Sequence, residues 1–117
     1  MRQNTQSILK GHRINYNLTL KDVAYLLDMD EGNLSRFEAG KSQNSKALLG
    51  YHFLFNLSID MSISQVSAHP SDVLVHRCFK LLEILGNQTP TLRIRNRIQG
   101  IERIITQLNQ EEDEYED

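Results

Sequence analysis

The side chains that could support covalent or metal chemistry are few and scattered in this 117-residue chain. Cys78 is the single cysteine, and His12, His52, His69 and His76 lack the close spacing of metal ligands. The sequence offers no nucleophile paired with a base and no glycine-rich phosphate-binding loop. We therefore expect no enzymatic activity, no metal and no cofactor. An unpaired cysteine is also typical of a reducing compartment.

Polar groups able to bind a partner are concentrated instead in the stretch LTLKDVAYLLDMDEGNLSRFEAGK. It predicts two short helices separated by a tight turn. Thr19 and Asp22 have the spacing of a capping box, in which each side chain satisfies a free backbone N–H at a helix start. This predicts the first helix at 20–27. Asp28 follows it and tolerates the left-handed conformation that often ends a helix.

The second short helix is expected over 31–38, with Asp30 as its N-cap. A carboxylate at this position accepts backbone hydrogen bonds and complements the helix dipole, an effect of about 0.5–2 kcal/mol. Leu34 and Phe37 form its apolar side, and Gly40 is the type of residue favoured just past a helix end. The acids at the start of this helix thus have a folding role.

Two further helices are expected to flank this pair. The first covers 6–16 and ends near Asn17. The second covers 46–56, with Ser45 as its cap. The inward side chains predicted for the two helices are Ile8, Leu9, Arg13 and Tyr16, and Leu48, Leu49, Phe53 and Leu57.

The C-terminal half predicts two longer helices in residues 71–109, after a small, polar linker at 62–70 that ends in Pro70. Apolar residues of the last helix recur at spacings of 4, 3, 4 and 3, which is the pattern of a packed helical seam. They are Ile94, Ile98, Ile101, Ile105 and Leu108. This seam could pack within the subunit, or across a two-fold axis as a dimer interface, which is our leading hypothesis.

Charge is distributed unevenly along the chain. The segment 110–117 carries six of the fifteen acids, and we expect it to be a disordered acidic tail. The rest has thirteen Lys and Arg against nine Asp and Glu, which is compatible with a polyanionic partner. The run LRIRNR, with Arg93, Arg95 and Arg97, is either a solvated helix face or a second contact for DNA or another partner.

The sequence has no apolar run typical of a signal peptide and none approaching the roughly 20 residues that span a bilayer. We therefore expect a soluble protein of the cytoplasm.

Residues 6–61 resemble the helix-turn-helix domain of phage repressors of the lambda repressor and Cro type, the Xre-like regulators. The likeness covers about half of the chain. It depends on an arginine in the first helix, a small residue where the two motif helices cross, and the sequence Glu-x-Gly-Lys after the second motif helix. The matching positions are Arg13, Leu18, Thr19, Asp22, Val23, Ala24, Leu34, Ser35, Arg36, Phe37, Glu38, Gly40, Lys41 and Leu48 to Leu57.

The resemblance implies an all-α fold, a five-helix lambda-repressor-like DNA-binding domain followed by a two-helix C-terminal segment. It implies that Arg13 and Glu38 form a structural pair that fixes the angle of the reading helix 31–38 in the major groove. Base contacts would come from Glu31, Gly32, Asn33 and Arg36, with Arg suited to guanine and Asn to adenine. Phosphate contacts would come from Lys21, Lys41, Ser42, Asn44 and Lys46.

The chain also departs from the family pattern. Leu20 replaces a glutamine that many relatives use to contact phosphate, and Asp28 replaces a common turn glycine. Glu31 beside Asp30 adds negative potential close to the expected DNA, which opposes non-specific affinity.

These observations predict a sequence-specific transcriptional regulator, repressor-like, cytoplasmic and associated with a bacterial or phage nucleoid. It would bind double-stranded DNA as a homodimer. The domains would be 1–61 for DNA, a linker at 62–70, a dimerisation or partner-binding hairpin at 71–109, and the tail at 110–117. The alternative is an antitoxin or anti-regulator whose C-terminal helices hold a protein partner.

Overall fold

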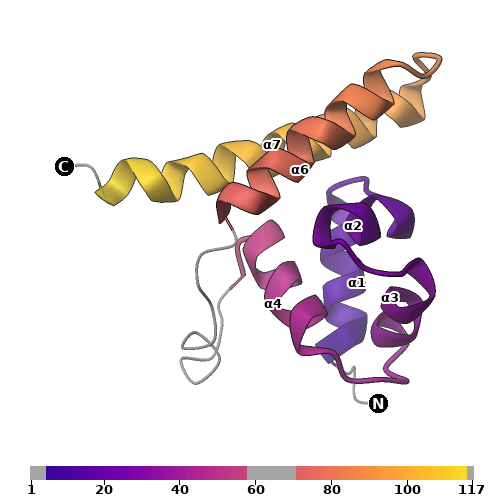
Figure 1. Ribbon diagram of the computed structural model, residues 1–117. Helices are drawn as coiled ribbons and strands as arrows, with labels where there is room; N and C mark the ends of the chain where they lie inside the picture. The colour runs from indigo at the N-terminus through magenta and orange to yellow at the C-terminus, as the bar shows by residue number, and fades with distance from the viewer. Residues whose placement is uncertain (1–4, 58–70, 116–117) are drawn as a thin grey trace.

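The computed structural model describes residues 5–57 and 71–115, with side chains described for 8–57 and 72–109. These residues form an all-α structure in which six helices and no strand occur (Figure 1). None of the described helices is both long and apolar enough to cross a membrane. The helices are α1 (Thr5–Asn15), α2 (Leu20–Leu27), α3 (Glu31–Glu38), α4 (Ser45–Leu54), α6 (Ser71–Gly86) and α7 (Leu92–Tyr115).

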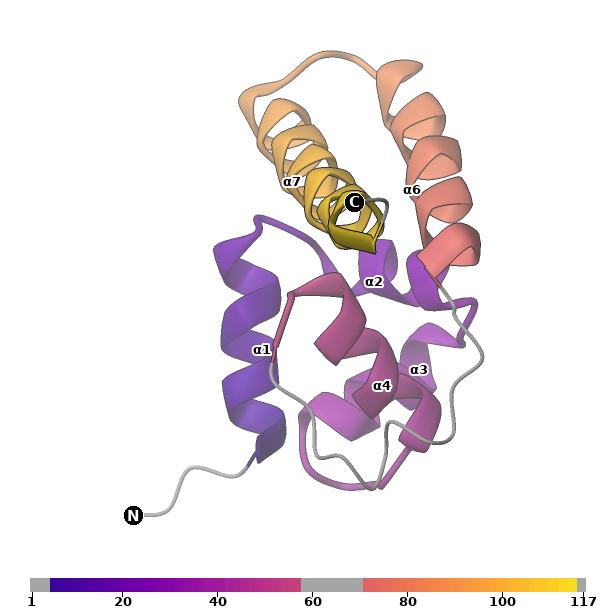
Figure 2. The same ribbon diagram turned by 90° about the vertical axis from the view of Figure 1, so that its left-hand side faces the viewer.

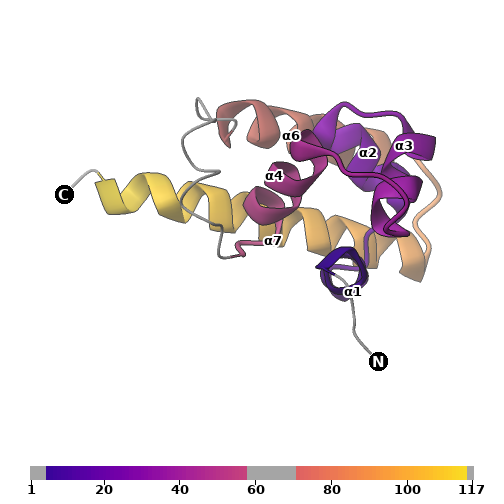
Figure 3. The ribbon, with the colours of Figure 1, turned by 90° about the horizontal axis from the view of Figure 1, so that it is seen from below.

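The first four helices form one group, and the antiparallel hairpin of α6 and α7 lies across it on the side of α2 (Figures 1 and 2). α6 packs against α2, while α7 contacts α4 and the end of α1 (Figure 3). Apolar side chains of both parts, such as Val23, Leu54, Cys78 and Ile104, belong to one continuous buried cluster. The hairpin therefore shares its core with the N-terminal helices, and we find no boundary in packing between the two halves.

Local chemistry sets the ends of the short helices, as the sequence predicts. The capping box at α2 is formed, with Thr19 N donating to Asp22 Oδ2 and Asp22 N to Thr19 Oγ1, both at 3.0 Å. Asn17, after α1, and Asp28, after α2, adopt left-handed backbone conformations with φ of 63° and 55°. Ile8, expected on the inner side of α1, is 48% exposed, because the buried side of that helix is formed by Leu9, with Arg13.

The prediction for α4 was wrong in two respects. Its N-cap is Asn44, not Ser45, and its buried side is formed by Ala47, Gly50, Tyr51 and Leu54. The predicted core residues Leu48, Leu49, Phe53 and Leu57 are only partly buried. The reason is close packing, because a Cβ on Gly50 would lie 2.4 Å from Leu27 Cδ2. The helix thus places Gly50 against Leu27 of α2.

The residues predicted to form a dimer interface pack within the single chain. Ile94, Ile101, Ile105 and Leu108 are at most 9% exposed within the single chain, and Ile98 is partly buried against the same core. The apolar face of α7 is therefore covered largely by the subunit's own helices.

Other predictions concern segment ends. Helix α7 continues to Tyr115, whereas we expected the last helix to end at residue 109 and a disordered tail to follow. Glutamate is a good helix former, which favours this continuation of the backbone helix. The short fifth helix expected near residue 60 and the linker at 62–70 lie outside the described residues.

Candidate nucleic-acid interface

The helix α3 is held at both ends by its own sequence. Asp30 Oδ2 accepts a hydrogen bond from Asn33 N at 3.0 Å, as expected of an N-cap. At the other end Gly40 has φ of 76°, and Lys41 N donates to Arg36 O at 2.9 Å. This left-handed glycine and its backbone bonds form a Schellman cap, which stops the helix after eight residues.

The inner side of α3 is fixed by a buried ion pair. The guanidinium of Arg13 donates two hydrogen bonds to the Glu38 carboxylate, at 2.7 and 2.8 Å, and a third to Leu18 O at 2.9 Å. Tyr51 Oη, from α4, also donates to Glu38 Oε2. Arg13 and Glu38 are 9% and 6% exposed, so the pair predicted from the sequence is a desolvated link between α1, α3 and α4.

Burial alone would lower the pKa of Arg13, but the hydrogen bonds and charge of Glu38 outweigh it and raise that pKa. Burial, and then the neighbouring Glu38, raise the pKa of Tyr51 above its ordinary value. Arg13 and Tyr51 therefore each keep one charge state over the physiological range.

The outer side of α3 carries the residues predicted to contact bases. Glu31, Asn33 and Arg36 are exposed, and Gly32 is partly exposed. Arg36 Nη2 donates to Asn33 Oδ1, one helical turn away, so these two side chains form a pair before any ligand is present. A Cβ on Gly32 would lie 3.0 Å from Asp30 Oδ2, so the absence of a side chain there leaves room for the capping carboxylate.

The residues predicted to contact phosphate are less uniform. Lys21 and Lys41 are exposed, and Ser42 is partly buried. Asn44 uses Oδ1 to accept from Ala47 N at 3.0 Å, so its observed role is to cap α4. Lys46 is exposed, but Nζ donates to Asp28 O at 3.1 Å, which ties α4 to the turn between α2 and α3.

Sequence reasoning missed a second ion pair, between the partly buried Arg97 of α7 and the buried Asp22 of α2. Arg97 Nε and Nη2 donate to the two carboxylate oxygens at 2.8 and 2.5 Å, and Asp22 is 1% exposed. These hydrogen bonds to Asp22 raise the pKa of Arg97. The same carboxylate thus completes the capping box of α2 and holds the hairpin. The sequence signal for it was only an arginine-rich run.

Further polar contacts from Arg77, Arg103 and Gln107 join the hairpin to the N-terminal helices. Arg77 Nε donates to Tyr25 O at 2.7 Å, and its guanidinium lies 4.8 Å from the centre of the Tyr25 ring. Arg103 lies 4.0 Å from the centre of the Tyr16 ring, whose hydroxyl donates to Gln107 at 3.0 Å. The hairpin is therefore fastened to α1 and α2, while α3 lies on the other side of α2 (Figures 1 and 2).

Comparisons with protein-family models, with curated proteins and with solved structures find no match to this chain.

Proposed function

We propose that this protein is a sequence-specific DNA-binding regulator of transcription that inserts α3 into the major groove. The observation that carries the proposal is the contrast between the two sides of α3. Its inner side is fixed by Arg13, Glu38 and Tyr51, and its outer side presents Asn33 and Arg36 to solvent. A short, rigid helix with exposed polar tips matches the requirements of base reading, because an α-helix fits the width of the major groove.

The arrangement of α1 to α4 supports assignment to a lambda-repressor-like domain. α2 and α3 are joined by a short turn, as in a helix-turn-helix unit. Ala24, the small residue expected where they cross, is 5% exposed. In this proposal α2 supports α3 from behind and the hairpin supports α2.

The hydrogen bond between Arg36 and Asn33 makes the proposed base preference more specific. Asn33 Oδ1 is used as an acceptor by Arg36, so the pair presents N–H donors outward. Guanine offers two acceptors, N7 and O6, in the major groove, whereas adenine needs both a donor and an acceptor. We therefore expect Asn33 and Arg36 together to prefer guanine. This differs from the expectation that Asn33 contacts adenine and Arg36 contacts guanine independently.

A salt series of binding measurements on fragments of the source genome tests the proposal. A DNA reader must bind with an affinity that falls steeply with salt and survives excess competitor DNA. The variant Arg36→Ala should lose about 1–3 kcal/mol of specific binding and relax one base position. Binding that fails against competitor DNA, or a footprint unaltered by Arg36→Ala, would remove α3 from the role of reader.

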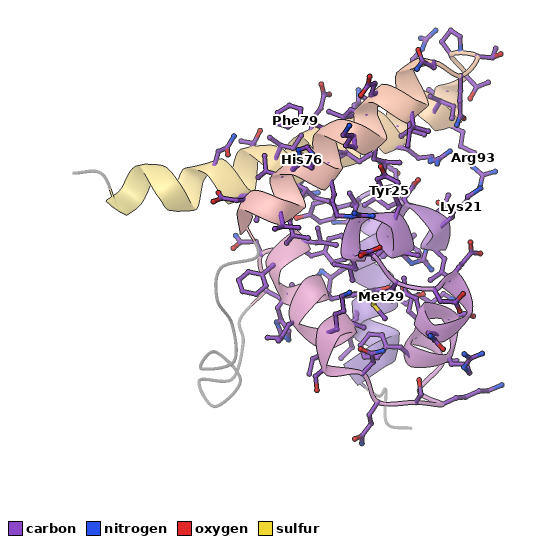
Figure 4. All side chains as sticks on the ribbon, in the orientation of Figure 1. Lys21, Tyr25, Met29, His76, Phe79 and Arg93 are labelled. Carbon is purple, nitrogen blue, oxygen red and sulfur yellow. The ribbon has the colours of Figure 1, made fainter. Side chains whose placement is uncertain are left out.

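A second candidate, a protein-interaction module such as an antitoxin, is favoured by one observation on α6. Val73, Phe79 and Ile84 are 60%, 55% and 42% exposed, and Figure 4 shows Phe79 on the side of α6 away from α2. Such apolar side chains are a candidate contact for a second copy or another protein. Sedimentation of the native protein and of Phe79→Asp distinguishes a second copy from another protein partner. Loss of a dimer in the variant would place self-association on α6.

A further inference from the structure

A hollow of about 520 Å³ lies between α2 and the hairpin, and its lining is rich in cations. Lys21, Arg93 and Arg97 line it, and Asp22 is the single carboxylate among its described lining residues. Asp22 is already bound by both donor nitrogens of Arg97. The positive charges of Lys21 and Arg93 are therefore not neutralised by the lining of the hollow.

Both of these side chains are accessible to a partner. Lys21 and Arg93 are exposed, and among the described residues neither has an acidic group within salt-bridge distance. Arg97, one turn further along α7, has the opposite character, because it is drawn into the ion pair with Asp22. Of the three arginines in LRIRNR, Arg97 thus fastens the hairpin and Arg93 remains available.

The hairpin places Arg93 over the start of α2. Arg93 also lines a second hollow, of about 610 Å³, together with Asn17, Thr19 and Leu20. Figure 4 shows Lys21 and Arg93 close together at one edge of the molecule, and α3 lies below them at the same edge (Figure 1). Two chain segments that are far apart in sequence therefore contribute cations to one edge.

We propose that Lys21 and Arg93 form a phosphate-binding edge that extends the DNA contact of α3 onto the C-terminal hairpin. This inference rests on the proposed function of α3. A guanidinium presents a planar fork of donors that matches phosphate, and an ammonium serves as a point charge for the same group. The edge would also offset the unfavourable potential of the exposed acids Asp30 and Glu31 near the duplex.

The chain supplies a matched control for Arg93. Arg95 lies two residues further along the same helix, about 200° around its axis, and it is also exposed. Replacing either arginine by alanine removes the same charge from the same turn of α7. Only Arg93→Ala removes it from the edge shared with Lys21.

The experiment measures binding of the full-length protein and its variants to a preferred duplex and to a random duplex, over a range of salt. Each phosphate contact contributes about 0.9 to the slope of log affinity against log salt. Arg93→Ala should reduce that slope by about one on both duplexes, Lys21→Ala should do the same, and the double variant should lose about two. Arg95→Ala should leave the slope unchanged. Thermal melting checks that each variant remains folded.

Equal slopes for Arg93→Ala and Arg95→Ala, with intact binding and an effect of Arg36→Ala, would overturn the edge and leave the proposed reading by α3 in place. A native protein that binds neither duplex would overturn both. A difference between Arg93→Ala and Arg95→Ala that appears only in binding to an acidic polypeptide, such as polyglutamate, would overturn the DNA edge in favour of a protein partner.

Discussion

Two ion pairs between an arginine and a buried carboxylate lie on opposite sides of the unit formed by α2 and α3, and they hold different parts of the structure. Arg13 and Glu38 hold α3 against α1 and α4, within the first half of the chain. Arg97 and Asp22 hold the hairpin against α2, across 75 positions in sequence. One pair therefore orients α3, the helix proposed to read DNA, and the other fixes the position of the C-terminal hairpin on α2.

The two pairs also differ in their surroundings. Glu38 accepts from Tyr51 as well as from Arg13, so its carboxylate is enclosed by three helices. Asp22 shares its carboxylate between Arg97 and the backbone of Thr19 at the start of α2. Loss of Arg97 would thus leave Asp22 one backbone donor, whereas loss of Arg13 would leave a buried carboxylate with a tyrosine alone.

The largest effect is expected from removing Arg13. Arg13→Met should cost about 3–5 kcal/mol of unfolding free energy, because Glu38 would remain buried as an uncompensated charge. Urea denaturation would measure this loss. The double variant Arg13→Met/Glu38→Leu should be less destabilised than the sum of the two single variants. Additive losses would show that the two side chains are not energetically coupled.

A smaller effect is expected at the contact between the hairpin and α1. A Cβ on Gly100 would lie 1.8 Å from Tyr16 O, so Gly100→Ala should displace α7 and cost about 1–3 kcal/mol. Gly11 is the control, since nothing lies within 4 Å of its Cβ position in the middle of α1. Gly11→Ala should stabilise the protein by about 0.5–1 kcal/mol. Thermal melts in which Gly100→Ala matched Gly11→Ala would contradict the close approach of α7.

The last prediction concerns the reactivity of Cys78, which is a direct probe of hairpin docking. This thiol is 0% exposed, and burial raises its pKa to about 12, so little of the reactive thiolate forms near pH 8. Alkylation by iodoacetamide should be much slower in the native protein than in urea. It should accelerate in Gly100→Ala, where α7 is displaced. Equal native and unfolded rates would mean that α6 is not docked.

The sequence predicted the helices α2 and α3 more fully than it predicted the position of the hairpin. The bounds of α2 and α3, their caps and the left-handed Asp28 were all predicted, because each depends on residues only a few positions apart. The Arg13–Glu38 contact was expected from a resemblance. Tyr51, its third member, was missed because α4 is apolar almost all round, which leaves its inner face undefined by periodicity.

The position of the hairpin could not be predicted by such local reasoning. The spacing of Ile94 and Ile101 identified an apolar seam, but a seam does not specify its partner. The internal packing of this seam occurs together with two contacts between distant segments, Arg97 with Asp22 and Gly100 with Tyr16. Nothing in the local sequence distinguished Arg97 from Arg93, although one is paired and the other exposed.

The central claim is that the exposed side of α3 reads base edges, and selection of binding sites from a randomised duplex pool tests it most directly. The native protein should enrich a motif that contains a conserved guanine, and Arg36→Ala should relax that position while its melting temperature stays within about 2 °C of the native protein. Enrichment of no motif by a folded native protein, or an identical motif from Arg36→Ala, would contradict the account.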